Sequence, residues 1–421
     1  MVLANFSEAN WVLLWSAFAV ALVLGAVANK TNFCTMGAVS DAVNMGDFGR
    51  LRAWLLAIAV AVLGVAVLEY AGLISADHSS PPYRSGQLVW AENLLGGIMF
   101  GVGMTLASGC SNKNLIRIGG GNCKAVVVVS IVAVVAYFMV RPIPGTDQTL
   151  FSLFFYPWTS PLAVNVGEAQ DLGTLLAGSA GAGAARLWIG LAIAAALFWF
   201  IFKSGDFRSN ADNIVGGLMV GLVVVAAWYV SSNVFVAADG GKYSLSGYAS
   251  EWDFLANAAS GARPANTAAL NPQSFTFINP LGDSFRLVLG GFSSIYLTFG
   301  VMAVLGIIAG SFLWSAVSGR LRFEWFVDIR DFLNHVIGAV LMGSGGVLAM
   351  GCSVGQGVTG ISTLACGSFI ALLAIMFGSA MTMKMQYYKM VYESDASLLA
   401  AAITSLVDLH LLPRTMRRLD A

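Results

Sequence analysis

Long apolar stretches separated by short polar connections run through the whole chain. Many of these stretches are close to about 20 residues long, which is the length that a helix needs to cross a bilayer. The predicted spans cover residues 11–28, 54–74, 93–109, 123–140, 187–202, 212–230, 286–309, 335–350 and 368–384. Two longer polar segments, 141–186 and 231–285, carry the Pro, Asn, Ser and Gly residues typical of irregular surface structure. The pattern therefore predicts an all-α polytopic membrane protein with about nine transmembrane spans.

The third and eighth spans share a sequence pattern. Residues 93–111, NLLGGIMFGVGMTLASGCS, align without gaps on residues 335–353, HVIGAVLMGSGGVLAMGCS, and eight of 19 positions are identical. A weaker match pairs TNFCTMGAVSDAV with QSFTFINPLGDSF, where Cys34 corresponds to Thr276. Because the third span would run inward and the eighth outward, the two copies are predicted to form inverted repeats.

The repeat divides the chain into four predicted segments. The first inverted repeat, with spans one to four, covers residues 1–140, and residues 141–211 hold an outside insertion plus the connecting span five. The second repeat covers residues 212–390, with spans six to nine and the outside insertion at 231–285. Residues 391–421 form the C-terminal tail. Short Gly-interrupted segments at matched positions of inverted halves mark substrate sites in secondary transporters. We therefore expect the Gly-rich broken half-helices to meet near the membrane midplane.

Composition and charge agree with a protein that lies in a lipid bilayer. Hydrophobic residues make up 57% of the chain and charged residues 10%, and the mean hydropathy is +0.77. The 22 Lys and Arg residues balance 22 Asp and Glu residues, so no basic excess favours nucleic acid. With the N-terminus outside, the basic residues on the outer side are only Arg84, Arg141, Arg186, Lys242, Arg263 and Arg286. The positive-inside rule thus predicts an outside N-terminus and an inside C-terminus.

Cysteines stand where the glycine-rich helices are expected to break. Cys110 and Cys352 occupy matched positions, each followed by a serine, Ser111 or Ser353. Irregular backbone at membrane depth is tolerated only when it is buried in protein or lines a cavity. A neutral thiol is a weak, polarizable donor that can contact a passing anion without trapping it. We therefore predict that Cys110, Cys352 and, by its place in the weaker match, Cys34 contact a permeating solute.

Donors and positive charge follow the two breaks. Lys113 and Arg117 follow Cys110, Gln356 follows Cys352, and Asn122 in GGGNCK can cap a helix whose N-terminus favours anions. These side chains are candidate anion contacts. Lys113 and Arg117 also fit ordinary positive-inside flanking, just as the repeated glycines fit close helix packing.

No metal or cofactor is predicted. The chain has no C-x-x-C motif, and His78, His335 and His410 are scattered, which disfavours a zinc or redox-disulfide site. A G-x-x-x-x-G-K-[ST] phosphate loop is also missing, so ATP hydrolysis by this chain is not expected. Cys123 and Cys366 are interpreted as small apolar fillers.

The segments NKTNFCTMGAVSDAV, GVGMTLASGCSNKN and GAVLMGSGGVLAMGCSVGQGVTG occur in this order. They resemble the YeeE/YedE family of bacterial inner-membrane proteins, whose characterised members import thiosulfate. The resemblance implies nine spans in two inverted halves and three relay cysteines, which by motif position are Cys34, Cys110 and Cys352, with Cys110 central. It also implies a bacterial inner membrane location, with a periplasmic N-terminus and a cytoplasmic C-terminus, and a soluble TusA-like sulfur carrier as a cytoplasmic partner. The long outside insertions, together with Lys113 and Arg117, depart from the compact family members.

The predicted function is import of a small sulfur-containing anion, with thiosulfate as the expected substrate, by a protein that is not an enzyme. Transport of sulfite or a selenium oxyanion is one alternative. A membrane thiol enzyme, such as a sulfurtransferase with Cys110 as nucleophile, is another, although no catalytic base lies near any cysteine in the sequence. A third is a non-transporting subunit of a larger membrane complex.

Overall fold

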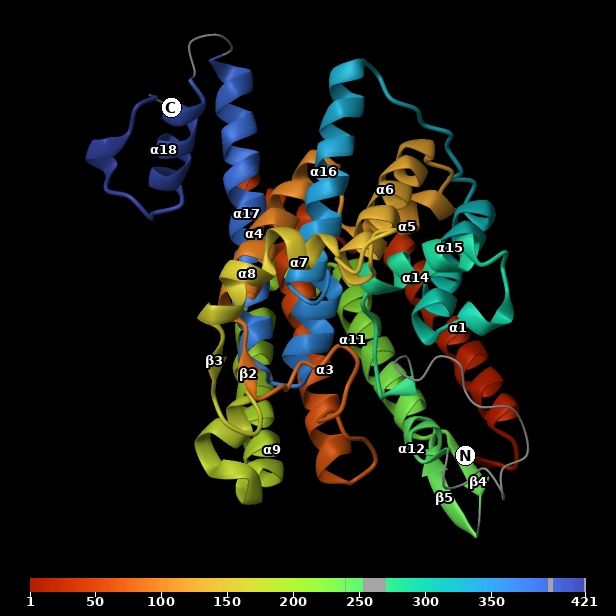
Figure 1. Cartoon of the computed structure of the whole chain (residues 1–421). Coiled ribbons are helices and arrows are strands. Elements are labelled where there is room, and N and C mark those ends of the chain that lie inside the picture. The colour runs from red at the N-terminus through yellow and green to blue at the C-terminus, as the bar shows by residue number, and fades with distance from the viewer. Residues whose placement is uncertain (239, 253–269, 393–396, 420–421) are drawn as a thin grey trace.

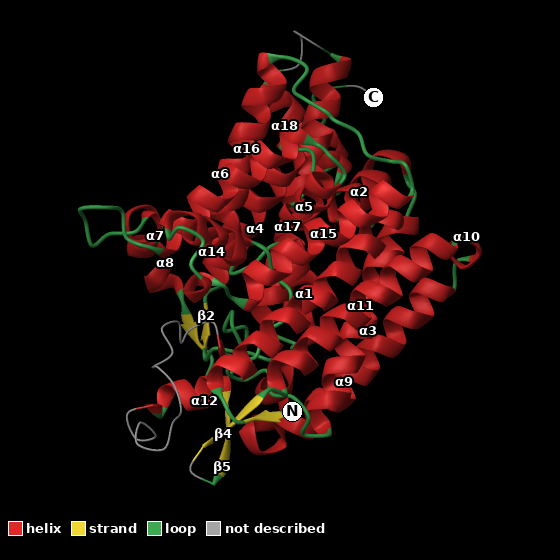
Figure 2. Ribbon diagram, turned by 90° about the vertical axis from the view of Figure 1, so that its right-hand side faces the viewer, coloured by secondary structure: helices red, strands yellow, loops and turns green. Residues whose placement is uncertain are grey.

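A computed structural model of the chain describes residues 1–238, 240–252, 270–392 and 397–419 (Figures 1 and 2). Within these residues, nine helical stretches are long and apolar enough to cross a membrane. This confirms the prediction of an all-α polytopic membrane protein. Arg263, one of the outer basic residues predicted above, lies outside the described residues.

The helices follow one another in three groups. The first group is α1 (Phe6–Lys30), α2 (Thr35–Ser40), the π-helix η1 (Asp41–Met45), α3 (Gly49–Tyr70), α4 (Trp90–Leu106), α5 (Ser111–Gly119) and α6 (Cys123–Val140). The middle group is α7 (Leu150–Phe154), α8 (Tyr156–Thr159), η2 (Ser160–Leu162), α9 (Leu172–Phe202) and α10 (Gly205–Ser209). The last group is α11 (Ala211–Ser232), α12 (Leu245–Ser250), α14 (Ile278–Leu289), η4 (Ser294–Tyr296), α15 (Phe299–Val317), α16 (Ile329–Leu348), the π-helix η5 (Gly355–Gly360), α17 (Cys366–Val391), α18 (Leu398–Asp408) and η6 (Arg414–Met416).

The described strands are short and form two small sheets. A three-stranded sheet has the order β1 (Val2–Leu3), β4 (Phe235–Ala238) and β5 (Gly241–Ser244), and β1 lies parallel to β4. A second pair joins β2 (Gln87–Leu88) to β3 (Val164–Asn165). The N-terminus and the β4–β5 hairpin lie at one end, and the C-terminal helix α18 lies at the other (Figure 1).

Side-chain caps explain where several of the long helices begin. Asp171 accepts a hydrogen bond from the backbone N–H of Thr174 at 3.1 Å at the start of α9, and Thr298 does the same for Val301 at 3.2 Å at the start of α15. A polar side chain in this position satisfies a backbone donor that has no partner within the helix. Capping therefore fixes helix starts in places where the hydropathy pattern alone is smooth.

The predicted seventh span, 286–309, is misplaced. The apolar run there contains the end of α14, a turn and the first half of α15. Gly291 and Phe292 in the turn have positive φ values of 65° and 60°. Two glycines in sequence allow the chain to reverse there, while the apolar residues around them keep the average hydropathy high. The long outer segments also contain helices α7, α8, α12 and α14, so the prediction that they are irregular is wrong in part.

Helices α4 and α16 meet at the centre of the molecule, backbone against backbone (Figure 1). A Cβ atom added to Gly96 would lie 2.6 Å from the carbonyl oxygen of Gly345, and one on Gly345 would lie 2.7 Å from that of Gly96. Gly103 and Gly338 approach each other in the same reciprocal way, at 2.6 Å in both directions. The repeated glycines therefore serve close helix packing.

The reciprocal contacts extend to other helix pairs. Helix α1 packs on α15 and α11 packs on α3, while α17 packs on α4 and α6 packs on α16. These pairs are the ones that a two-fold relation between the halves would produce. That relation would exchange α1 with α11, α3 with α15, α4 with α16 and α6 with α17. The inverted orientation of the two halves remains a prediction, and this packing favours it.

Candidate functional site

The two Gly-Cys-Ser segments have the same backbone conformation. Helix α4 ends at Leu106, Ser108 takes a positive φ of 54°, and the N–H of Gly109 donates to the carbonyl of Met104 at 2.8 Å. In the second segment, Met350 takes a φ of 57°, and the N–H of Gly351 donates to the carbonyl of Gly346 at 2.8 Å. Each helix thus stops in a left-handed turn, and a short new helix starts immediately after the cysteine. The prediction of broken helices at Cys110 and Cys352 is confirmed.

The three predicted relay cysteines are buried and carry free thiols. Cys34, Cys110 and Cys352 are 6%, 1% and 0% exposed. The Cys34 sulfur accepts a hydrogen bond from the N–H of Gly37, and the Cys352 sulfur accepts one from the N–H of Gly355, both at 3.4 Å. Each of these two sulfurs therefore caps the start of a short helix, because it binds the backbone N–H three residues further along the chain.

Cys110 lies close enough to the other two thiols to interact with both. Its sulfur interacts electrostatically with Cys34, with Cys352 and with the side chain of Ser353. The hydroxyl of Thr35 donates to Oγ of Ser353 at 2.9 Å, so the helix that begins after Cys34 contacts the second break directly. The structure thus brings together residues that are more than 300 positions apart in the sequence.

Several buried polar atoms around the cysteines have no hydrogen-bond partner among the described residues. They include the hydroxyls of Ser111 and Thr276 and the amide oxygen of Gln356. A buried hydroxyl left without a partner costs about 1–3 kcal/mol of folding free energy. Gln356 uses its amide nitrogen on the backbone carbonyl of Ala349. The two hydroxyls therefore remain as donors for a polar solute near the thiols.

Lys113 lies beside the Cys34 end of this group. Its ammonium group donates to the side-chain oxygen of Asn32, and its charge interacts with Cys34, Cys110, Arg117 and Arg50. Lys113 and Arg117 are both on α5 and both half-buried. The predicted positive charge thus lies next to Cys34. The three buried thiols of Cys34, Cys110 and Cys352 are called the thiol file below.

Asn122 caps α6 as predicted, because its side-chain oxygen accepts from the N–H of Ala125 at 3.0 Å. Its amide nitrogen donates to the carboxylate of Glu324, and the N–H of Cys123 donates to the backbone carbonyl of Glu324 at 3.1 Å. Both polar atoms of the Asn122 side chain are therefore engaged, and a carboxylate already occupies the position in which an anion was expected.

Of three cavities near this group, one is lined by a cysteine, Cys34. The outer pocket, about 200 Å³ in volume, is lined by Thr276, Arg141 and Asp283 and opens among connections that the predicted topology places outside. The inner cavity, about 10 Å³, is lined by Cys34 and Arg50. The inner vestibule, about 560 Å³, shares its lining residue Asn213 with the inner cavity and also includes Arg52. The vestibule is further lined by Met45, Gly46, Asp47, Phe48, Gly49, Ser204, Asp206, Phe207 and Asn210.

Thr276 connects the outer pocket to the second break. A Cβ atom placed on Gly351 would lie 3.4 Å from the Thr276 hydroxyl oxygen, and one on Gly355 would lie 2.4 Å from it. The backbone N–H of Phe277 interacts with the Cys352 sulfur. The residue that corresponds to Cys34 in the sequence match is thus adjacent to Cys352, between that thiol and the pocket.

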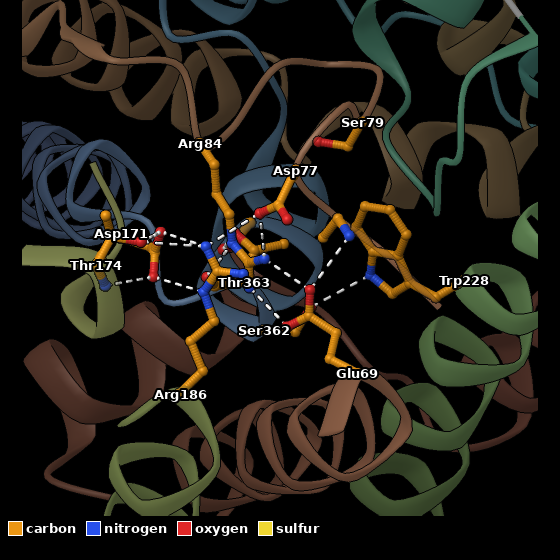
Figure 3. Close-up of polar contacts among 12 residues, drawn as sticks. Glu69, Asp77, Ser79, Arg84, Asp171, Thr174, Arg186, Trp228, Ser362 and Thr363 are labelled. Carbon is orange, nitrogen blue, oxygen red and sulfur yellow. Dashed lines mark hydrogen bonds and ion pairs between the residues drawn. The ribbon is translucent and has the colours of Figure 1, made fainter. Parts of the chain in front are cut away.

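A buried ion-pair network holds the second break from the side that the predicted topology places outside (Figure 3). The guanidinium of Arg84, 2% exposed, donates to the carboxylate of Glu69 at 2.6 and 2.8 Å, to Asp77 at 3.0 Å and to the backbone carbonyl of Thr363 at 2.9 Å. The neighbouring hydroxyl of Tyr83 donates to the carbonyl of Gly355 at 2.9 Å. The loop between α3 and α4 therefore fixes both ends of the η5 segment.

Arg186 completes the network from α9. It contacts Asp171 at 2.8 and 2.9 Å and Asp77 at 3.0 Å. Burial would raise the pKa of Asp171, but the hydrogen bonds of Arg186 and the charge of Arg84 outweigh it and lower that pKa to about 2. From the sequence, Arg84 and Arg186 are predicted only as basic residues on the outer side. The sequence spacing of the arginines and their acidic partners does not indicate that they pair. The one signal is Glu69, an acidic residue close to the end of a predicted span.

Comparisons with known proteins agree with this geometry. A family model described as sulphur transport matches residues 30–381. The chain belongs to the sulphur transport family. The resemblance to the YeeE/YedE family is thereby confirmed. All three relay cysteines fall inside the matched region.

Two curated relatives are both called thiosulfate transporter TsuA. That of Escherichia coli (strain K12) is 24% identical over 378 residues, which cover 85% of this chain and 90% of the relative. That of Spirochaeta thermophila is 23% identical over 375 residues, which cover 87% of this chain and 97% of the relative. The relatives and the apolar helices together support a multi-pass membrane protein that transports a sulfur compound.

Proposed function

We propose that this member of the sulphur transport family imports thiosulfate across a bacterial inner membrane. The observation that carries the proposal is the file of three buried free thiols, in which Cys110 interacts with both Cys34 and Cys352. The outer pocket is lined by Thr276, which is adjacent to the Cys352 break, and the inner cavity is lined by Cys34. The printed names of both relatives point to the same substrate.

In the proposed path, the anion enters the outer pocket, passes Thr276 and reaches Cys352, then Cys110, then Cys34. Neutral S–H groups donate to the sulfur or oxygen atoms of thiosulfate, and the free hydroxyls of Ser111 and Thr276 add stronger donors. Each contact is weak enough for the anion to move on. No bond is made or broken, so the path uses no cofactor and no catalytic base.

The direction of the path follows from the proposed topology. The N-terminus and the strand-bearing end face the periplasm, and Cys34, Lys113 and the inner vestibule face the cytoplasm. The basic residues of the chain favour this orientation, since most of them lie in connections on the Cys34 side. A TusA-like sulfur carrier would receive the imported sulfur at that side. The matched breaks and reciprocal helix pairs support two inverted halves that share the central file.

Uptake by the purified protein in liposomes tests this function. Radiolabelled thiosulfate should accumulate inside liposomes that contain only this chain, and unlabelled thiosulfate should compete better than sulfite, sulfate or selenite. Better competition by sulfite or selenite would assign the substrate to that anion instead. If no anion enters and thiosulfate is instead chemically converted outside, the sulfurtransferase alternative replaces transport.

A further inference from the structure

Two aspartates occupy matched positions on either side of the thiol file. Asp41 lies seven residues after Cys34, and Asp283 lies seven residues after Thr276. Each carboxylate has an arginine partner: Asp41 accepts from two nitrogens of Arg50, and Asp283 accepts from Arg141 at 3.3 Å. The two arginines come from α3 and from the end of α6. The two aspartates therefore occupy corresponding positions in the sequence match, whereas the two arginines come from helices that do not correspond.

The inner pair closes off Cys34. The Arg50 guanidinium lies against α2, where a Cβ atom on Gly37 would be 2.3 Å from Nη1. The same Gly37 donates its N–H to the Cys34 sulfur. The inner cavity beside Cys34 and Arg50, at about 10 Å³, holds about one water molecule and is too small for a tetrahedral oxoanion. In the described part of the chain, Nη1 of Arg50 has no hydrogen-bond partner.

The two ion pairs differ in the exposure of their carboxylates, whereas Arg50, at 32%, is about as exposed as Arg141. Arg141 and Asp283 line the open outer pocket, and their side chains are 33% and 29% exposed. Asp41 in the inner pair is only 5% exposed. An anion can therefore reach Arg141 and Thr276 through the open pocket, whereas Cys34 and Arg50 line only the small inner cavity, which meets the inner vestibule at Asn213.

A further arginine lies beyond the inner pair. Arg52 lines the vestibule, its buried Nε has no partner among the described residues, and its guanidinium lies 6.0 Å from the ring of Phe48 and 5.7 Å from that of Phe200. The lining residue Asn213 belongs to both the cavity and the vestibule. Arg52 is thus a positive group on the far side of the closed Arg50–Asp41 pair.

We propose that Arg50–Asp41 and Arg141–Asp283 are oxoanion-binding gates at the inner and outer ends of the thiol file. In each gate, the guanidinium leaves its carboxylate to bind the passing anion and returns to it after the anion has moved on. Carboxylates and sulfur oxoanions both offer pairs of oxygen atoms to the planar donor fork of arginine. The exchange therefore replaces one charge-assisted pair with another. This inference rests on the proposed transport of a sulfur oxoanion.

Labelling of Cys34 with a membrane-impermeant maleimide tests the inner gate without any transported anion. The protein is reconstituted in liposomes, the reagent is applied from the Cys34 side, and the modified peptide is quantified by mass spectrometry. In Asp41→Asn, the pair with Arg50 is weakened, and Cys34 should be labelled about tenfold faster than in the unchanged protein. Arg50→Lys, which keeps the charge but loses the paired donors, should give an intermediate rate.

Controls separate gating from unfolding and from failure of the proposed function. Asp331→Asn breaks a pair with Lys124 that lines none of the three cavities, and it should leave Cys34 labelling unchanged. Asp283→Asn should also leave Cys34 protected, but it should alter the concentration dependence of thiosulfate uptake. Equal Cys34 labelling in Asp41→Asn, Arg50→Lys and the unchanged protein would overturn the gate, even where thiosulfate transport is intact. Absence of uptake by the unchanged protein would instead remove the proposed function.

Discussion

The two cysteine breaks share a backbone and differ in what surrounds them. After Cys110, helix α5 carries Lys113 and Arg117, both half-buried. After Cys352, every residue from 353 to 360 is buried, and the positions corresponding to those two cations are Gly355 and Thr359. One conformation thus serves a cationic break and a neutral one. Between the two breaks, the anion on the proposed path passes the neutral donors around Cys352 before it reaches the positive charge of Lys113 and Arg117.

The supports of the two breaks differ as well. Tyr83 and Arg84 bind the backbone carbonyls of Gly355 and Thr363, which fixes the second break to the outer loop. At the first break, the side chain of Asn114 donates to the carbonyls of Gly109 and Cys110, at 2.8 and 3.2 Å. At the second break, Gln356 also binds the carbonyl of Ala349, so the neutral break has a distant charged network in addition to a contact of the kind that Asn114 makes at the cationic break.

The largest effect expected from this difference is on stability. Replacing Arg84 by Gln leaves the buried carboxylate of Glu69 without its cation and should destabilise the protein by about 3–5 kcal/mol. Thermal unfolding of the detergent-solubilised protein measures the loss. Lys242→Gln, which removes an exposed outer cation, is the matched control and should unfold like the unchanged protein. An unshifted transition in Arg84→Gln would mean that the second break does not depend on the outer network.

The next effect concerns Cys110, the thiol of the first break, which also interacts with Cys352 and Ser353 of the second break. Replacing Cys110 by Ala removes the central donor, and the loss of one hydrogen bond to an anion, about 1.5–3 kcal/mol, should lower thiosulfate flux by about one to two orders of magnitude. Cys123→Ala keeps all three relay thiols and should transport nearly normally. Initial uptake rates in liposomes, normalised to inserted protein, give the comparison. Normal flux in Cys110→Ala with reduced flux in Cys123→Ala would reverse the roles assigned to these cysteines.

The smallest effect is expected at the cationic side of the first break. Replacing both Lys113 and Arg117 by Gln removes the positive charge near Cys34 and should reduce uptake several-fold, with normal membrane insertion. The reduction should weaken at high salt, because ions screen the attraction of partly exposed charges. Uptake measured at low and high ionic strength tests this prediction. Equal uptake by the variant and the unchanged protein at low salt would leave both residues as topology signals only.

The spans and the cysteine breaks could be predicted from the sequence because their signals are local. Hydropathy marks the helices, and the repeated Gly-Cys-Ser marks where two of them stop. The cap made by Asn122 was also predictable, since its partner is three residues away. Hydropathy could not find the turn before α15, because the two glycines there have apolar neighbours.

Pairs formed between distant residues could not be predicted in this way. Arg141 and Asp283 are 142 positions apart, and Asn122 and Glu324 are 202 apart. No periodicity or motif connects such residues, because only the packing of the helices brings them together. For the same reason, the sequence favoured Asn122 as an anion donor, whereas its amide binds a carboxylate.

The glycine contacts between α4 and α16 restrict how this protein can move. Where two backbones touch without intervening side chains, neither helix can slide or roll without a collision between main-chain atoms. We therefore expect the α4–α16 pair to stay fixed and to oppose rigid-body rocking of one predicted half against the other. Motion is left to side chains and to the short helices next to the thiols. With the proposed gates, we therefore expect the protein to act as a gated pore and not as a carrier with a moving domain.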